Sequence, residues 1–154
     1  MTGRPWYEEA PLPDLLRAAR DAYRDAVVRA LAEAGCDDVP RNGALVIAAL
    51  GRDTSKLSFS PQADVVASLG LSKQAASQLI DTLVLRTYLE RRVDPEDRRR
   101  MGVRLTSRGR TAADAILGAV DAVEFSLAKL ITADQLLGLR AGLAAFKEVS
   151  VGHD

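Results

Sequence analysis

The sequence has few of the residues on which enzymes and metalloproteins depend. Its 154 residues include one cysteine, Cys36, and one histidine, His153, which lies beside the C-terminal residue. A single cysteine cannot form an intrachain disulfide. We find no cluster with metal-ligand spacing, no phosphate-binding glycine loop and no nucleophile elbow. We therefore expect neither an enzyme nor a protein that holds a metal or a cofactor.

Long apolar runs are also missing. No run reaches the ~18 residues that a membrane span needs, and the first residues contain no apolar core of a signal peptide. We expect a cytoplasmic protein that does not enter a membrane. Aromatic residues make up 5% of the chain, whereas hydrophobic residues together make up 47%. Because alanine and leucine dominate, this composition favours a mainly helical domain of ordinary size with its own core.

The formal net charge is zero, but the charge is unevenly distributed. Residues 86–110 contain nine arginines and four acidic residues, a local excess of five positive charges. A basic patch of this kind can hold phosphate groups even on a neutral protein, provided that the acidic residues lie elsewhere.

Residues 72–84 are predicted to form an amphipathic helix. Ser72 is a good N-cap, because its hydroxyl can accept a hydrogen bond from the first turn. Apolar side chains recur at helical spacing on one face. They are Ala76, Leu79, Ile80 and Leu83. The opposite face carries Gln74, Ser77, Gln78 and Asp81, with Lys73 at its flank.

That polar face is built mostly from hydroxyl and amide side chains, which can read base edges in the major groove of DNA. We predict that Ser72, Lys73, Gln74, Ser77 and Gln78 face bases or phosphates, with Gln74 and Gln78 as candidates for adenine. Asp81 either accepts a hydrogen bond from cytosine or points to water. The alternative is an ordinary solvated helix face.

A hairpin with an arginine-rich tip follows the helix. Residues 88–93 are predicted to form a strand, residues 94–97 a turn and residues 102–105 the return strand. Arg98, Arg99 and Arg100 lie between the turn and the return strand. A helix that leads into such a hairpin indicates a winged helix-turn-helix, with the helix in the major groove and the tip at phosphates or the minor groove. The alternative for the three arginines is a solvated charge run.

These segments resemble the MarR family (multiple-antibiotic-resistance regulators). The matching segments are residues 72–77, Tyr88-Leu89-Glu90-Arg91, Asp94-Pro95-Glu96-Asp97-Arg98-Arg99 and Val103-Arg104-Leu105-Thr106-Ser107-Arg108-Gly109. The resemblance assigns the role of wing-tip arginine to Arg98 and Arg99, and less directly to Arg100. It also implies that Asp97 stabilises the wing through an ion pair with one of them. Arg91, Arg92 and Arg104 either follow the DNA backbone or pair with Glu90 and Asp94.

Two positions depart from the pattern of the family. Thr87 stands where relatives often have glycine, and a β-branched residue at a left-handed helix terminus costs on the order of 1 kcal/mol. We therefore expect the end of the helix to be arranged differently, with a small shift of the wing. Gly102 weakens the return strand.

The rest of the chain predicts helices and turns around this unit. Residues 1–11 are expected to be a loose arm in which Trp6 and Tyr7 dock on a partner or on the core. The expected helices span 12–34, ended by Gly35; 43–50, capped by Asn42, apolar nearly all round and therefore expected to be buried; 61–69, started by Ser60-Pro61; 107–131, capped by Thr106; and 133–149, started by a Thr132/Gln135 capping box. Residues 57–59 are expected to form a minimal strand, and Gly70 the turn of the helix-turn-helix.

We thus expect one mainly α domain with a small β wing, spanning 1–154. Residues 43–106 form the winged helix-turn-helix, and the apolar helices at 12–34 and 107–149 are expected to form a dimerisation region, as the resemblance also implies. The predicted function is a homodimeric repressor of a pseudo-palindromic DNA site, relieved by a small lipophilic or aromatic ligand. The alternatives are an activator, a degenerate winged-helix protein that acts through protein partners, and a redox sensor that uses Cys36.

Overall fold

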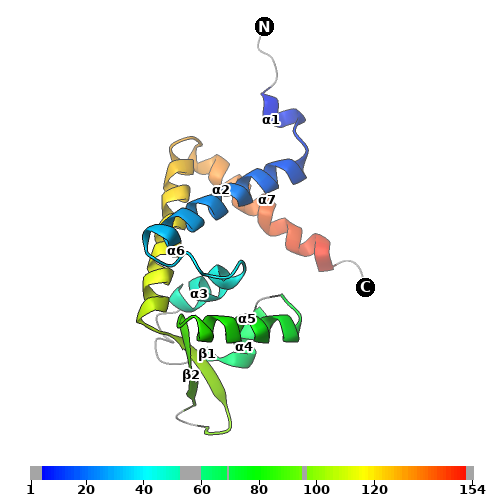
Figure 1. The fold of residues 1–154 in the computed structure, drawn as a ribbon. Coiled ribbons are helices and arrows are strands. Elements are labelled where there is room, and N and C mark those ends of the chain that lie inside the picture. Colours follow the sequence, from blue (N-terminus) through cyan, green and yellow to red (C-terminus); the bar gives the residue numbers. More distant parts are fainter. Residues whose placement is uncertain (1–4, 53–59, 69, 95–96, 152–154) are drawn as a thin grey trace. The chain divides into compact units, whose positions relative to one another are not determined.

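The computed structural model describes residues 5–52, 60–68, 70–94 and 97–151. The fold is mainly helical with a small antiparallel sheet (Figure 1), which confirms the predicted fold class. The elements are α1 (Trp6–Glu9), α2 (Leu12–Glu33), α3 (Gly43–Arg52), β1 (Ser60–Pro61), α4 (Gln62–Ser68), α5 (Lys73–Leu85), β2 (Leu89–Val93), β3 (Met101–Leu105), α6 (Ser107–Ala128) and α7 (Ala133–Val151). None of the described helices is both long and apolar enough to cross a membrane.

The chain divides into two compact units, residues 1–120 and 121–154. The first contains every element from α1 to β3 and most of α6, and the second contains the end of α6 and the whole of α7. The buried core lies in the first unit, where side chains from α2 to α6 meet. Its largest fully buried members are Tyr88, Ile47, Ile80, Leu83 and Leu89.

The N-terminal segment is more ordered than the sequence suggested. Trp6 and Tyr7 belong to the short helix α1, and their rings meet edge to face at 6.2 Å between centroids. Both rings are exposed, so neither docks on the core. The helix α2 matches its predicted span, and Gly35 follows it with a φ of +69°. Glycine accepts this left-handed conformation without a steric penalty, which explains why the helix ends there.

The short helix α3 is buried on most of its surface but not all round. Val46 and Ile47 are completely buried, whereas Leu45 is 63% exposed. The prediction that this helix is buried was therefore wrong at Leu45 and Ala49, which are both exposed. An apolar composition does not reveal which side of a short helix lacks a neighbour.

The sheet has the order β1-β3-β2, with both pairings antiparallel. In β1, Ser60 pairs with Val103 and Pro61 with Gly102. The predicted helix start at Ser60-Pro61 was wrong, and α4 begins one residue later than Pro61. Proline tolerates an edge strand, where its missing N–H is not needed by a neighbour. The strand predicted at residues 57–59 lies outside the described residues.

The helix-turn-helix forms as predicted. Gly70 makes the turn between α4 and α5 with a φ of +61°. The Ser72 hydroxyl caps α5 by accepting the Ala75 N–H at 3.2 Å. Ala76, Ile80 and Leu83 are completely buried, whereas most of the predicted polar face is exposed.

Local capping signals also set the starts of α6 and α7. The Gly109 N–H donates to the Thr106 hydroxyl at 3.0 Å. At α7, the Thr132 N–H donates to the Gln135 side chain (2.9 Å) and the Gln135 N–H donates to the Thr132 hydroxyl (3.2 Å), which is a reciprocal capping box. The helix α6 ends at Ala128, slightly before its predicted end, and α7 extends to Val151.

Candidate nucleic-acid interface

The polar face of α5 presents the predicted contact residues to solvent. Ser72, Lys73, Gln74 and Gln78 are exposed, and Ser77 is partly buried. Lys73 and Ser77 also line an open depression of about 600 Å³ between α4, α5 and the start of β3. Its other lining residues are Gln62, Ala63, Val66, Ala67, Leu71 and Met101. The structure thus brings the predicted residues of α5 together on one accessible surface next to the wing.

Asp81, at the far end of this face, is engaged by the protein itself. Its carboxylate forms an ion pair with Arg91 of β2, although 60% of the Asp81 side chain is exposed. Arg91 also donates through Nε to the Gln62 side chain of α4 at 3.5 Å. Asp81 thus has a partner within the protein that neither of its two predicted roles included, and Arg91 pairs with Asp81 rather than with Glu90. Arg91 links β2 to both helices of the helix-turn-helix.

The wing tip is closed by backbone hydrogen bonds around Asp97. The Asp94 N–H donates to the Arg100 carbonyl and the Arg100 N–H to the Asp97 carbonyl, each at 2.9 Å. The Asp97 carboxylate accepts the backbone N–H of Arg99 at 3.0 Å. Asp97 thus contacts the wing backbone, and among the described residues it forms no ion pair with Arg98 or Arg99, which differs from the expected mode of stabilisation.

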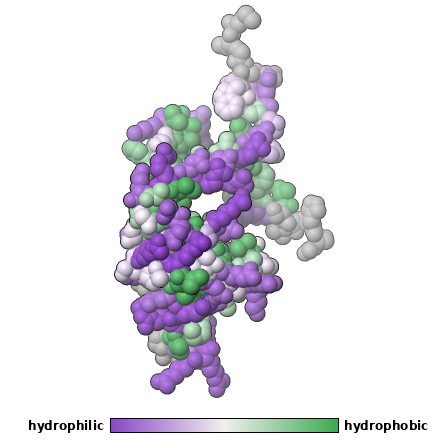
Figure 2. All heavy atoms as spheres, in the orientation of Figure 1, coloured by the Kyte–Doolittle hydropathy of each residue, from purple (hydrophilic) through white to green (hydrophobic). Residues whose placement is uncertain are grey.

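Arg98, Arg99 and Arg100 are all exposed, and none forms an ion pair with another described residue. The projecting end of the wing is mostly hydrophilic in Figure 2. Three guanidinium groups at an exposed tip can each donate to phosphate oxygens. The wing therefore offers three exposed guanidinium groups beside α5.

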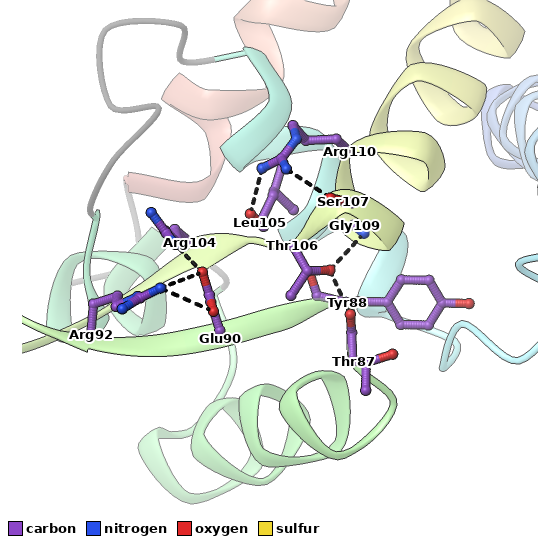
Figure 3. Close-up of polar contacts among 10 residues, drawn as sticks. All are labelled: Thr87, Tyr88, Glu90, Arg92, Arg104, Leu105, Thr106, Ser107, Gly109 and Arg110. Atoms are coloured by element: carbon purple, nitrogen blue, oxygen red, sulfur yellow. Dashed lines mark hydrogen bonds and ion pairs between the residues drawn. The ribbon is translucent and has the colours of Figure 1, made fainter.

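Two further arginines, on the strands of the wing, share one carboxylate. Arg104 and Arg92 both donate to Glu90, the latter at 3.3 Å (Figure 3). Hydrogen bonding from Arg104, followed by that from Arg92, holds the pKa of Glu90 below its ordinary value. Of the two roles open for these arginines, the structure shows pairing with Glu90. Arg92 and Arg104 are thereby engaged within the wing, whereas the guanidinium groups of the tip are not paired with Glu90.

The base of the wing is fixed around Thr87, which adopts the left-handed conformation with a φ of +61°. The Thr106 hydroxyl donates to the Thr87 carbonyl at 2.5 Å and lies 3.2 Å from the Tyr88 carbonyl (Figure 3). The expectation that threonine changes the arrangement of this helix end was therefore wrong. Thr87 takes up the conformation that suits glycine, because the chain must turn there from the end of α5 into β2.

Sequence reasoning missed a polar cluster on the other side of the wing base. The buried Tyr88 hydroxyl donates to the Asp38 carboxylate, and Arg108 donates to the same Asp38 Oδ1 at 2.8 Å. Arg86 donates to the Asp38 carbonyl. The hydrogen bond from Tyr88, with a further contribution from the Arg108 charge, lowers the pKa of Asp38, while burial raises the pKa of Tyr88. The only sequence signal was an acidic residue in a short connector, which predicts no particular partner.

Comparison with known proteins agrees with this geometry. A family model described as MarR family matches residues 37–100, which include α3 to the wing tip. A search of curated proteins found no match.

Several structures of MepR from Staphylococcus aureus share the fold. The MepR–DNA complex superposes with a TM-score of 0.72 at 19% identity, covering 92% of this chain and 99% of that chain. MepR in its DNA-binding conformation gives 0.71 at 18% identity, covering 91% and 98%. MepR bound to ethidium bromide gives 0.60 at 19% identity, covering 92% and 98%. Residues 37–100, which carry the helix-turn-helix and the wing tip, thus match the MarR family model, and the chain shares its fold with these structures of MepR.

Proposed function

We propose that this DNA-binding regulator acts as a homodimeric repressor of a pseudo-palindromic operator and is released by a small lipophilic or aromatic ligand. The observation that carries the proposal is the exposed Ser/Gln face of α5 beside a wing tip with three exposed arginines. The first feature suits base edges, and the second suits phosphates or a narrow minor groove.

Direct readout is assigned to the exposed face of α5. Gln74 and Gln78 carry amides that can bond both edge atoms of adenine, and Ser72, Lys73 and Ser77 serve bases or phosphates. Asp81 is excluded from this set, because its carboxylate is held by Arg91. The Asp81–Arg91 pair instead supports α5 against β2.

Phosphate contact is assigned to Arg98, Arg99 and Arg100. Arg92 and Arg104 contribute less, because Glu90 neutralises part of their charge. Asp97 keeps the tip in shape through the Arg99 backbone.

Dimerisation is assigned to residues 12–34 and 107–149, and DNA binding to residues 43–106. Large apolar side chains remain exposed along α7, at the end of α6 and in the turn between them, as expected for a surface that meets a second copy. They include Phe125, Leu130, Leu137, Leu139, Leu143 and Val149. A two-fold dimer places two recognition helices about one DNA turn apart, ~34–36 Å, which explains why the operator is expected to be a pseudo-palindrome. A regulator of this kind works in the cytoplasm.

Release by a lipophilic or aromatic ligand is supported by the shared fold of MepR, of which one structure contains ethidium bromide. Redox control through Cys36 is disfavoured by its burial, since only 2% of the residue is exposed and its thiol lies 3.6 Å from the Ala34 carbonyl. A buried thiol is shielded from oxidants.

The test is to select bound sequences from a random duplex library with the purified protein, and to footprint the DNA that flanks its own gene. We expect a palindromic site whose affinity falls steeply with salt, because each phosphate contact releases counterions. Arg99→Ala should weaken binding to many sequences and make the salt dependence shallower, as expected when one phosphate is no longer neutralised. Gln74→Ala should relax preference at one base position, at a cost of about 1–3 kcal/mol. If no salt-sensitive binding is found, the protein acts through protein partners instead.

A further inference from the structure

Four residues that are far apart in sequence form one polar cluster beneath the wing. We call Asp38, Arg86, Tyr88 and Arg108 the Asp38 cluster. Asp38 lies in the connector between α2 and α3, Arg86 caps the C-terminal end of α5, Tyr88 precedes β2 and Arg108 lies in the first turn of α6. The connector is thereby joined to the end of α5, to the residue that precedes β2 and to the first turn of α6.

Asp38 is the centre of these contacts. Its carboxylate accepts from the Tyr88 hydroxyl and from Arg108 Nη2, and its carbonyl accepts from Arg86. Arg108 also donates through Nη1 to the Arg86 carbonyl at 2.7 Å, and its guanidinium lies 4.4 Å from the centre of the Tyr88 ring. Removing the Asp38 carboxylate alone would leave the Tyr88 hydroxyl and Arg108 Nη2 without this acceptor.

The burial of Tyr88 makes its contact with Asp38 specific. Tyr88 is completely buried, so its hydroxyl must find a partner inside the protein or lose a hydrogen bond. Asp38 and Arg108 are partly exposed, at 42% and 37% of their side chains. A partly exposed ion pair contributes little to global stability. We therefore expect the Asp38 cluster to orient the base of the wing rather than to add much to the free energy of unfolding.

We propose that Asp38 is a positioning residue that couples the end of α2 to the wing and recognition helix, so that a movement of the connector changes DNA affinity. This inference rests on the proposed function. Asp38 lies among several arginines, so its negative charge by itself opposes DNA binding. If electrostatics alone decided the affinity, removing the Asp38 charge would tighten DNA binding. If Asp38 positions the wing, removing its carboxylate would weaken DNA binding instead.

The experiment compares Asp38→Ala with Asp37→Ala, which removes the same charge from the adjacent exposed residue of the connector. The probe is a fluorescent duplex enriched by the selection described above, titrated at several salt concentrations. We expect Asp38→Ala to weaken binding at least about tenfold and to make the salt slope shallower by about one for each phosphate that the displaced wing no longer neutralises. Asp37→Ala should bind as well as the wild type or more tightly. Equal affinities and slopes for the two variants would overturn the proposal.

Hydrogen exchange of the DNA-free protein provides a second measurement. In Asp38→Asn and Tyr88→Phe, which are milder changes, amides of residues 87–94 and 101–106 should exchange faster while those of α3 stay unchanged. An equal increase in amide exchange across the whole chain, or no increase at residues 87–94 and 101–106, would reject a positioning role. This test stands even if Asp38→Ala does not fold. If the wild type binds no DNA, the proposed function fails, but this exchange pattern still decides whether Asp38 holds the wing.

Discussion

Thr87 shows how a single residue can be held in a conformation that it does not favour. Its φ of +61° is maintained by its own N–H, which donates to the Val84 carbonyl at 3.0 Å, and by the Thr106 hydroxyl on its carbonyl. Thr87→Gly should raise the free energy of unfolding by about 1 kcal/mol, because glycine adopts this region without a steric penalty. Urea unfolding monitored by circular dichroism measures the change.

The control for this prediction is Thr87→Ala, which also shortens the side chain but keeps a Cβ in the left-handed region. It should recover only part of the gain seen with glycine. If Thr87→Gly is less stable than the wild type, the Thr87 side chain must contribute a contact that outweighs its strain.

Residue roles that depend on near neighbours could be predicted from the sequence. The caps at Ser72, Thr106 and Thr132 were correct, because each partner lies three residues along the chain. The partners of Asp38 lie 50 and 70 residues away, at Tyr88 and Arg108. No local sequence pattern specifies partners at such a distance. The many arginines of residues 86–110 also offered every acidic residue several possible partners.

At the scale of elements, the Asp38 cluster predicts a defined dependence on pH. The pKa of Asp38 is lowered in the folded protein, first by the Tyr88 hydrogen bond and then by Arg108. A carboxylate with a lowered folded pKa stabilises the protein above its unfolded pKa, near 3.9, and the stabilisation is lost as pH falls through the folded pKa. The raised pKa of Tyr88 keeps its hydroxyl protonated as a donor throughout this range.

We therefore expect the wild type to exceed Asp38→Asn in unfolding free energy by a constant amount between about pH 5 and pH 7, and the difference to diminish as the pH falls below about 4. Urea titrations of both proteins at each pH measure this difference. Glu90, whose pKa is also lowered, is present in both proteins and cancels in the comparison. A difference that persists unchanged to about pH 2, well below the ordinary pKa of an aspartate, would show that the Asp38 charge is not its cause.

The elements themselves were largely predictable, and the exceptions have physical reasons. The signal for a helix start at Ser60-Pro61 was overridden by pairing with Val103 and Gly102, which lie about 40 residues later in the chain. Gly109, the last residue of the segments that resemble the MarR family, was singled out only through that resemblance. The structure gives the reason, because a Cβ at Gly109 would lie 2.0 Å from the Tyr88 carbonyl oxygen.

For the whole molecule, the second unit has little core of its own. No residue of 121–149 is fully buried, and apolar side chains (green) are visible where the end of α6 meets α7 in Figure 2. An ion pair between Arg140 and Glu124 joins the two helices at 3.0 Å, but an exposed pair contributes only modestly to stability. Burial against a second copy would supply the apolar contacts that this unit lacks.

Leu137→Glu tests this dimer directly, because Leu137 is 65% exposed on α7. In a two-fold interface the substitution is present on both copies, so we expect the dissociation constant of the dimer to rise at least about a hundredfold as carboxylates are buried without partners. The matched control is Leu45→Glu on α3, which is 63% exposed and lies outside the proposed dimerisation helices. Sedimentation velocity across a range of concentrations should show a monomer for Leu137→Glu and a dimer for Leu45→Glu, and DNA binding should weaken together with dimerisation. A Leu137→Glu protein that remains a dimer at micromolar concentration would place the interface elsewhere and would remove the basis for the spacing of the two recognition helices.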